Sequence, residues 1–411
     1  MSLNIRDPIH GFIQINDIET QLIQTYSFQR LRFIHQLGTT SWIYPTGVHT
    51  RFDHSLGVLH LAARFVNRLK LLNLEISDED EKVFRIAALL HDIGHAPFSH
   101  LSEDMKLFRE GWNHEKMGEK IIIESEIGKI IRSKLGDESV DRIIFIITGR
   151  KKPVLSLDNL FHILLTGQAG IDRMDYLLRD SYFLGVMYGK FDLERILETF
   201  MYDEEHDIFW EDGGKHALEQ FLLARYFMFT EVYFHKTRRI LDYHLSILVK
   251  EYLKSEKKEE FLPLDVEEYL KINDLSVLHW MMNTNNSYKN VFLNRKFFKK
   301  INIESDDHPD EAEIIKWQWL ETELSRQFSA TDYYLDKADK APYKFENPED
   351  VKIAFGNKIL PLSKISKLVA SLRPIRKRRI YASEERKEDV FTFVKTFFDK
   401  FNKKGGYHEY S

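Results

Sequence analysis

Apolar residues recur with helical spacing over most of residues 18–300, and charged residues occupy the opposite faces. The pattern predicts helices within the segments 18–37, 84–94, 117–135, 167–185 and 217–253. Two short segments, 11–16 and 200–212, do not follow it. We expect hairpins there, the second with a polar turn around Glu204–His206.

The pattern changes after about residue 290. Acidic residues between Asp306 and Glu313 suit the positive end of a helix dipole. Strand-like runs follow at 351–355 and 378–382, with a Gly356-Asn357 turn after the first, and a final amphipathic helix is expected over 387–401. The predicted fold is mainly α, with a helical core over residues 1–290 and a smaller α+β lobe over residues 291–411.

The amino-acid composition of the chain excludes several classes of protein and site. The chain has no cysteine, which excludes disulfides, Cys-ligated zinc and thiol catalysis and fits a reducing compartment. No apolar run approaches the ~18 residues of a membrane helix, and the first residues lack an apolar signal region. The net charge of −5 argues against a wholly nucleic-acid-binding surface. We therefore expect a cytoplasmic protein with no membrane partner.

The segment AALLHDIGHAPFSH at 87–100 combines an apolar run with many titratable groups. We expect its helix to end near Gly94 in a left-handed conformation, with Pro97 blocking continuation. The groups that follow the apolar run are His91, Asp92, His95 and His100. They could be caps that interact with the helix dipole, but four such groups within ten residues favour a metal site.

Two other segments add candidate groups. HTRFDHSLGV at 49–58 offers His54 behind Arg51. GIDRMDYLLRD at 170–180 offers Asp172, Asp175 and Tyr176, whose spacing lets one helical face present all three. The alternative for that helix is a salt-bridged surface stripe, which its many apolar residues disfavour.

The segments RFDHSLGV, HDIGHAPFSH and GIDRMDYLLRD occur in the order found in the HD-domain superfamily of metal-dependent phosphohydrolases, which the chain resembles. It is most similar to the deoxynucleoside triphosphate triphosphohydrolase branch. Further matching segments are DPIHGFI (7–13), FQRLRFIHQLG (28–38), WNHEKMG (112–118) and VYFHK (232–236). The resemblance covers residues 5 to about 240 well and the C-terminal lobe loosely, and it implies an HD-domain helical core.

The resemblance implies one divalent metal ion, with the ligands His54, His91, Asp92 and Asp172. Two imidazoles and two carboxylates suit Mg, Mn, Fe or Ni, with Zn as a further candidate. The implied reaction is hydrolysis of dNTPs to deoxynucleoside and inorganic triphosphate. Two alternatives stay open: an HD-type phosphodiesterase or nucleotidase, and a nucleotide- or nucleic-acid-binding regulator with a structural metal.

The resemblance also implies catalytic residues. His95 and His114 match active-site histidines, one of which would protonate the leaving oxygen with Glu103 as its orienting partner. An imidazole suits this role because its unperturbed pKa lies near the operating pH. The family often has aspartate at the position of Glu103 and typically lysine at that of Arg173, so the local geometry is expected to differ.

The implied substrate-binding residues are Gln36, Leu37, Arg51, His100, Arg173, Tyr176, Asp180, Arg225, Phe229 and Tyr233. The three arginines and Tyr176 would hold the phosphates. Gln36 and Asp180 would bind the sugar 3′-hydroxyl, while Leu37 and Tyr233 would exclude a 2′-hydroxyl. Phe229 stands where a relative has histidine, which favours stacking and broad base tolerance. Without the resemblance, Leu37, Phe229 and Tyr233 are equally well explained as core residues.

In the resembling branch, an activating nucleotide binds between subunits and promotes a tetramer. Gln29 and Arg32 match residues of that site, so we expect a nucleotide-regulated homotetramer. Gln24 stands where an acidic residue reads guanine, so strict guanine dependence is not expected. The basic segment RPIRKRR at 373–379 is interpreted either as a solvated strand edge or as a phosphate site for an effector or nucleic acid.

Overall fold

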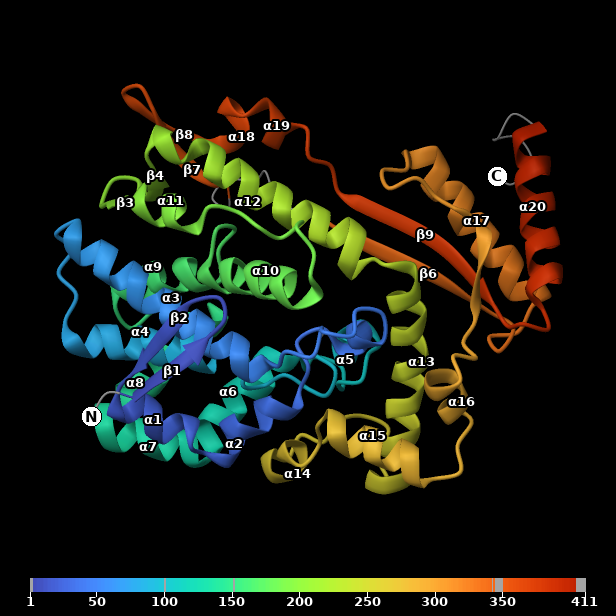
Figure 1. The fold of residues 1–411 in the computed structure, drawn as a ribbon, viewed down its shortest axis with the longest axis horizontal. Coiled ribbons are helices and arrows are strands. Elements are labelled where there is room, and N and C mark those ends of the chain that lie inside the picture. The colour runs from blue at the N-terminus through green and yellow to red at the C-terminus, as the bar shows by residue number, and fades with distance from the viewer. Residues whose placement is uncertain (1–2, 100, 151, 342, 344–349, 404–411) are drawn as a thin grey trace. The chain divides into compact units, whose positions relative to one another are not determined.

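The structure is a computed structural model that describes residues 3–99, 101–150, 152–341, 343 and 350–403 (Figure 1). The chain forms two compact units that are discontinuous in sequence. The first comprises residues 1–228, 245–284 and 343–371, and the second comprises 229–244, 285–342 and 372–411. The single domain boundary near residue 290 stays a prediction. No helix among the described residues is long and apolar enough to cross a bilayer.

The first unit is mainly helical. Its helices are α1 (Asp17–Ile23), α2 (Tyr26–Gln29), α3 (Arg51–Leu71), α4 (Asp78–Leu90), α5 (Leu101–Asp104), α6 (His114–Glu124), α7 (Glu126–Leu135), α8 (Asp137–Thr148), α9 (Ser156–Thr166), α10 (Ile171–Leu184), α11 (Leu193–Glu198), α12 (Lys215–Phe227), α14 (Val266–Leu270), α15 (Asp274–Asn283), α18 (Leu362–Ile365) and α19 (Lys367–Ala370). Its strands are β1 (Leu3–Asp7), β2 (Gly11–Ile15), β3 (Phe200–Asp203), β4 (Asp207–Trp210), β7 (Lys352–Phe355) and β8 (Lys358–Pro361). Helix α13 (Lys236–Tyr252) runs from the second unit into the first.

The core of the first unit forms where α3, α4, α8, α9 and α10 pack against one another. The start of α4 is set by Ser77 and Asp80, which cap it reciprocally, and by four acidic residues in its first turn. The apolar face that follows is fully buried, and Phe84 stacks on Phe161 of α9 at 4.3 Å. The rigid packing of α3, α4 and α10 fixes the positions of the polar residues that these helices carry.

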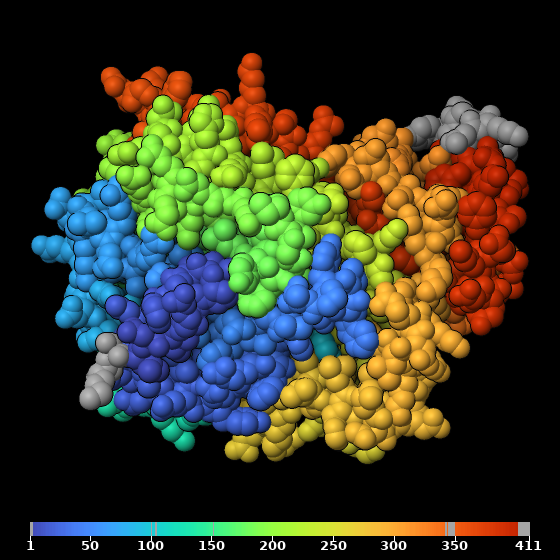
Figure 2. Space-filling model, in the orientation of Figure 1, coloured from blue at the N-terminus to red at the C-terminus, as the bar shows by residue number. Residues whose placement is uncertain are grey.

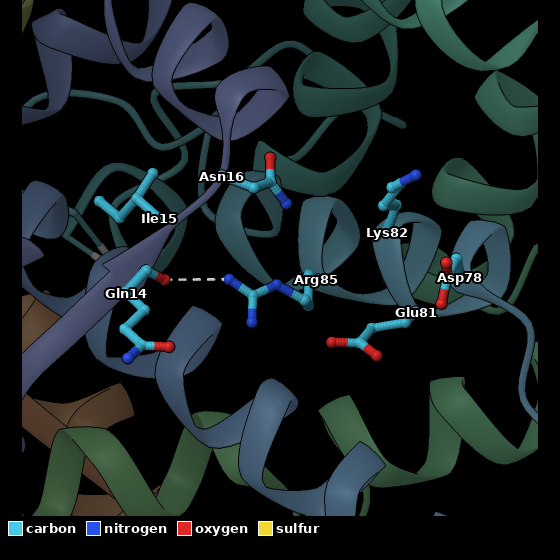
Figure 3. A pocket seen from close by; sticks show the side chains of 7 residues that line it. All are labelled: Gln14, Ile15, Asn16, Asp78, Glu81, Lys82 and Arg85. Atoms are coloured by element: carbon cyan, nitrogen blue, oxygen red, sulfur yellow. Dashed lines mark hydrogen bonds between the residues drawn. The ribbon is translucent and has the colours of Figure 1, made fainter. Parts of the chain in front are cut away.

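An N-terminal hairpin formed by β1 and β2 packs on α3 and lies at the surface of the first unit (Figure 2, dark blue). The predicted hairpin at 11–16 supplies only its second strand, since the turn precedes Gly11. Arg85 of α4 fastens the end of β2 by donating to the Gln14 carbonyl at 3.0 Å (Figure 3) and to the buried Glu19 carboxylate at 2.6 and 2.9 Å. These contacts border a surface pocket lined by Gln14, Ile15, Asn16, Asp78, Glu81, Lys82 and Arg85.

The predicted hairpin at 200–212 is confirmed as β3 and β4, and the predicted turn after residue 355 is confirmed between β7 and β8. Gly356 occupies that turn with a φ of +58°. The four strands form one sheet in the order β3-β4-β7-β8, in which β4 and β7 are parallel. Residues 343–371 therefore belong to the first unit, although they lie within the stretch predicted as a separate lobe.

The second unit has the α+β character predicted for the C-terminal region. Its elements are α16 (Tyr288–Leu293), β5 (Lys299–Glu304), α17 (Glu311–Gln327), β6 (Tyr333–Lys340), β9 (Ile375–Ala382) and α20 (Lys387–Lys403). The sheet has the antiparallel order β5-β9-β6, and α17 and α20 bury their apolar faces in one core with it. Asp310 caps the predicted acidic start of α17.

The basic segment 373–379 lies largely in β9, which is the middle strand of that sheet. The interpretation as a solvated strand edge is therefore wrong. Three of its cations form ion pairs within the unit: Lys377 with Asp307 at 2.5 Å, Arg378 with Asp339 at 2.8 Å and Arg379 with Glu304 at 3.1 Å. These pairs join neighbouring segments of the second unit, which gives the basic residues a structural role.

Candidate metal centre and active site

Three segments of the first unit bring predicted metal ligands to one point. His54 comes from α3, Asp172 from the first turn of α10, and His91 from the turn after α4. The Nε2 atoms of His54 and His91 lie 3.2 Å apart, and Asp172 Oδ1 lies 3.1 and 3.7 Å from them. The ligating atoms all lie within 4.8 Å of one another. Oxygen and nitrogen ligands about 2.1 Å from one ion lie roughly 3 Å apart, so the spacing fits a single ion.

The hydrogen bonds of the two histidines leave both Nε2 atoms facing the centre. His54 Nδ1 donates to Asp175 at 2.8 Å, and His91 Nδ1 donates to the Ala88 carbonyl at 2.8 Å. Two nitrogen lone pairs at this separation repel each other, so a positive charge must lie between them. Burial alone would lower the pKa of His54, but the hydrogen bonds that it donates to Asp172 and Asp175 raise the pKa to about 10. The site therefore favours a cation, whether a proton or a metal ion.

Asp92 adds a second carboxylate beside the same histidines. Its Oδ1 lies 3.4 Å from His91 Nε2, and its Oδ2 lies 3.6 Å from His54 Nε2. Arg51 Nη1 donates to Asp92 Oδ2 at 2.6 Å, and both residues are buried. Although burial opposes the charge, Arg51 and His91 hold the pKa of Asp92 well below its usual range. A charged carboxylate at this position suits a fourth metal ligand.

The predicted catalytic histidines lie beside this carboxylate. The rings of His95 and His114 stack with centroids 4.1 Å apart, and His95 Nε2 lies 3.2 Å from Asp92 Oδ1. Burial, together with Arg51 and His114, holds the pKa of His95 well below its usual range. His95 is therefore neutral at pH 7 unless a bound anion compensates for its charge.

The structure shows that Gly94 does not end its helix in the left-handed conformation that the sequence predicted. Helix α4 ends at Leu90, and Gly94 is not among the glycines with a left-handed backbone. A Cβ at Gly94 would lie 2.0 Å from the His114 carbonyl oxygen and 2.3 Å from the Gly118 nitrogen. Glycine is required here because the start of α6 lies against this turn, and that contact brings His114 to His95.

A strained loop connects the predicted metal ligands to the segment that carries Gln36. Phe98 and Ser99 have φ values of 59° and 58°, which are unfavourable for non-glycine residues. The loop is held by Asp274, which accepts from the Phe98 amide at 2.7 Å and from the backbone and ring of His35. Ser99 Oγ accepts from Arg51 at 2.9 Å and donates to the His35 carbonyl at 2.6 Å. These bonds fix Arg51 relative to residues 35–37.

The predicted sugar-binding residues are buried near this loop. Asp180 of α10 accepts from His49 Nε2 at 2.7 Å, and the backbone nitrogen of Gln36 donates to the His49 carbonyl at 3.0 Å. Gln36 Oε1, His49 Nδ1 and Arg51 Nη2 are buried and have no hydrogen-bond partner among the described residues. Buried polar atoms are rarely left in this state unless a ligand or water binds them.

The remaining phosphate-binding candidates are Tyr176, Arg173 and Arg225. Burial raises the pKa of Tyr176, and the charges that act on it are Arg225, Arg173, Asp172 and Asp180. Arg225 is buried and donates to Gln168 Oε1 at 3.1 Å, while Arg173 donates to the Thr166 carbonyl at 2.8 Å. The charges of these two arginines therefore act on Tyr176, which lies one turn along α10 from the predicted ligand Asp172. Leu37 is buried in the same unit.

The contacts of the described residues do not test the places of the other predicted residues in this group. His100 and the side chain of Glu103 lie outside the described residues. Phe229 and Tyr233 belong to the second unit, where their rings pack edge to face at 5.0 Å, and their roles at the base and sugar stay predictions. Gln29 and Arg32, predicted for the effector site, bond to each other at 2.8 Å near the surface.

The sequence interpretation did not assign three polar residues that contact the site. His49 binds Asp180, and Asp175 binds His54 on the side away from Asp172. His10 of the N-terminal hairpin also contacts Asp175, at 2.6 Å. The sequence could have indicated a role for Asp175, because this residue shares a helical face with Asp172. His10 and His49 lie within matching or neighbouring segments, but their partners are more than 100 residues away.

Comparison with known proteins agrees with this geometry. An HD domain matches residues 51–158, and an HD associated region matches residues 191–405, which is more than half of the chain. The chain is 32% identical to the uncharacterized protein YwfO of Bacillus subtilis over 84% of its own length and 81% of YwfO. It is 32% identical to the deoxynucleoside triphosphate triphosphohydrolase SAMHD1 homolog of Dictyostelium discoideum, over 66% of this chain and 53% of that protein.

A solved structure supports the same conclusion. A hypothetical protein from Aquifex aeolicus superposes with a TM-score of 0.82 at 32% identity, covering 96% of this chain and all of that one. The HD domain begins at Arg51 and contains His54, His91 and Asp92. The chain therefore belongs to the HD phosphohydrolase superfamily, in the group that carries an HD-associated region, and is a metal-dependent phosphohydrolase.

Proposed function

We propose that this protein hydrolyses deoxynucleoside triphosphates to deoxynucleoside and inorganic triphosphate. The proposal depends on three buried polar atoms that lie near the candidate metal centre and have no hydrogen-bond partner among the described residues: Gln36 Oε1, His49 Nδ1 and Arg51 Nη2. They lie on segments that directly contact the metal ligand Asp92 and the carboxylate Asp180. A ligand with a hydroxyl group and an anionic group would satisfy them, and a nucleotide has both.

The cationic residues favour a long phosphate chain. Arg51 faces Asp92, whereas Arg173 and Arg225 act on Tyr176, one turn along α10 from Asp172. Guanidinium groups bind phosphate oxygens through two parallel hydrogen bonds, so three of them suit a triphosphate better than a monophosphate. The similarity to a deoxynucleoside triphosphate triphosphohydrolase homolog supports the same substrate class.

In the proposed reaction, water attacks the α-phosphorus, the bond to O5′ breaks, and a proton must reach O5′. His54, His91, Asp92 and Asp172 would hold a divalent metal ion, which would polarise a phosphate oxygen and activate water. We assign protonation of O5′ to His95, with His114 stacked behind it. The negative charge of a bound triphosphate favours the protonated form of His95, whose pKa is low in the protein alone.

The sugar would be held by Gln36 and Asp180. His49 donates to Asp180 and so keeps that carboxylate oriented as an acceptor for a 3′-hydroxyl. Leu37, the residue after Gln36, would leave no room for a 2′-hydroxyl. This arrangement predicts preference for deoxynucleotides over ribonucleotides.

The product test separates the proposal from its alternatives. Purified protein with Mn²⁺ or Mg²⁺ is incubated with each dNTP, each NTP, a dNMP and a cyclic dinucleotide, and the products are resolved by ion-exchange chromatography. We expect intact triphosphate and deoxynucleoside in a 1:1 ratio. Pyrophosphate with dNMP, phosphate with dNDP, or hydrolysis of only the cyclic dinucleotide would each assign the site to a different reaction.

We also propose that the protein is a nucleotide-regulated homotetramer. Gln29 and Arg32 support this, because they match residues of an effector site between subunits and lie near the surface. Gln24 is exposed, and its amide offers one acceptor where a carboxylate offers two, which should weaken guanine preference by about 1.5–3 kcal/mol. Light scattering with each nucleotide, and a matrix of all dNTPs and NTPs as activators, measure both properties. A monomer under every condition, or an absolute need for GTP or dGTP, would contradict the proposal.

A further inference from the structure

Asp175 lies directly behind the metal ligands and accepts four hydrogen bonds. Its Oδ2 accepts from His54 Nδ1 at 2.8 Å and from Arg179 Nε at 2.9 Å. Its Oδ1 accepts from His10 Nε2 at 2.6 Å and from Arg179 Nη2 at 2.9 Å. The side chains of Asp175, His54 and Arg179 are completely buried, and that of His10 is 2% exposed. Water therefore cannot replace any of these partners.

The N-terminal hairpin completes this group through Asp7 and His10. Arg179 Nη1 donates to Asp7 Oδ2 at 2.8 Å. The other oxygen of Asp7 accepts from the backbone nitrogens of Ile9 and His10 at 2.8 and 2.9 Å, which fixes the turn between β1 and β2. The same carboxylate thus binds Arg179 and sets the backbone that carries His10. The turn and Asp175 are held in one rigid arrangement.

Helix α3 leaves space for this carboxylate. Gly57 lies one turn after His54, and a Cβ on it would come within 1.8 Å of Asp175 Oδ1 and 2.4 Å of Arg179 Nη2. Any larger residue would displace the carboxylate from His54. Residues of three separate elements, α3, α10 and the N-terminal hairpin, therefore hold the contact between Asp175 and His54 in place.

We propose that Asp175 is a positioning residue for the metal ligand His54, and that Asp7 and His10 make the N-terminal hairpin part of the metal centre. A carboxylate on Nδ1 holds the imidazole with Nε2 free to bind the metal, fixes the ring orientation and raises ligand basicity. This inference needs only the metal site. It can hold or fail whatever the substrate is.

The test measures the Kd for Mn²⁺, from the electron paramagnetic resonance signal of the free ion, in the full-length metal-depleted protein. We expect Asp175→Asn to weaken Mn²⁺ binding about 10–100-fold, the usual effect of losing such a partner. His10→Leu removes one of the four bonds to the carboxylate and should weaken it about 2–10-fold. Both variants should keep the circular dichroism spectrum of the wild type.

Asp158→Asn is the matched control. Asp158 is a fully buried carboxylate of the same unit that pairs with Arg142 at 2.9–3.0 Å, so its loss reports general destabilisation. Its Kd for Mn²⁺ should equal that of the wild type even though its melting temperature falls. A wild-type Kd in folded Asp175→Asn, or equal weakening in Asp158→Asn, overturns the proposal. If Asp175→Asn does not fold, wild-type affinity in both Gly57→Ala and His10→Leu overturns it.

Discussion

Replacing His91 by alanine should remove the bound metal and abolish hydrolysis while the fold survives. His91 Nε2 faces His54 and Asp172, so its loss leaves the ion one nitrogen ligand short. Away from this centre, its Nδ1 donates to the Ala88 carbonyl three residues earlier in the chain, so the substitution removes only one local hydrogen bond among the described residues there. Metal catalysis supplies several kcal/mol of transition-state stabilisation, so the rate should fall by about 10³-fold or more. Elemental analysis and the dNTP assay measure the two effects.

His162→Ala is the control for this variant. His162 also donates from Nδ1 to a helix carbonyl, that of Ile146, but contacts none of the ligands. It should retain both metal and activity. Asp92→Ala is less informative, because it would leave Arg51 as an unpaired buried charge and cost about 3–5 kcal/mol of stability. Unchanged metal content in His91→Ala would refute the ligand assignment.

Replacing His95 by alanine should lower kcat by roughly 10²–10⁴-fold with the metal still bound, as expected for loss of a positioned general acid. The ring lies between Asp92 and His114 and is almost fully buried, so alanine also leaves a cavity. His95→Phe separates the two effects, because it keeps a ring against His114 but cannot carry the proton. We expect both variants to lose kcat to a similar extent.

Two outcomes would contradict this role. Loss of the metal from both variants, measured by elemental analysis, would make His95 a ligand. A near-normal kcat in His95→Phe would make the stacked ring a packing element and transfer the acid role to another residue. Single-turnover measurements would show whether the lost rate belongs to the chemical step.

The sequence predicted the residues of the candidate metal site better than the residues that hold them in place. His54, His91 and Asp172 each belong to a short segment with a recognisable spacing, and the helices that carry them are set by local apolar periodicity. Asp175 was placed correctly on the face of Asp172, but the two carboxylates bind opposite nitrogens of His54. Which nitrogen of His54 each carboxylate binds depends on how α3 crosses α10, and no local sequence pattern encodes that crossing.

The sequence-based predictions were wrong or incomplete where tertiary contacts override local sequence signals. Gly94 looked like a helix C-cap, whereas its missing side chain allows the approach of α6. The cations around Arg378 suggested an exposed edge, but β9 has a strand on each side and acidic partners on neighbouring segments. The pairing of β4 with β7 joins residues about 140 positions apart. The sequence predicted only a hairpin at 200–212 and, separately, a strand-like run at 351–355 followed by a turn.

The parallel pairing of β4 with β7 has a consequence during protein synthesis. The ribosome completes the whole HD domain and β4 long before it makes Ile353, the residue that pairs with Trp210. Until then the edge of β4 has no partner from β7, and loop closure over this distance is slow. A nascent or truncated chain that stops before β7 exposes an unpaired strand edge, which promotes aggregation. The synthesis of β7 thus determines when the edge of β4 is covered and the first unit can no longer aggregate through it.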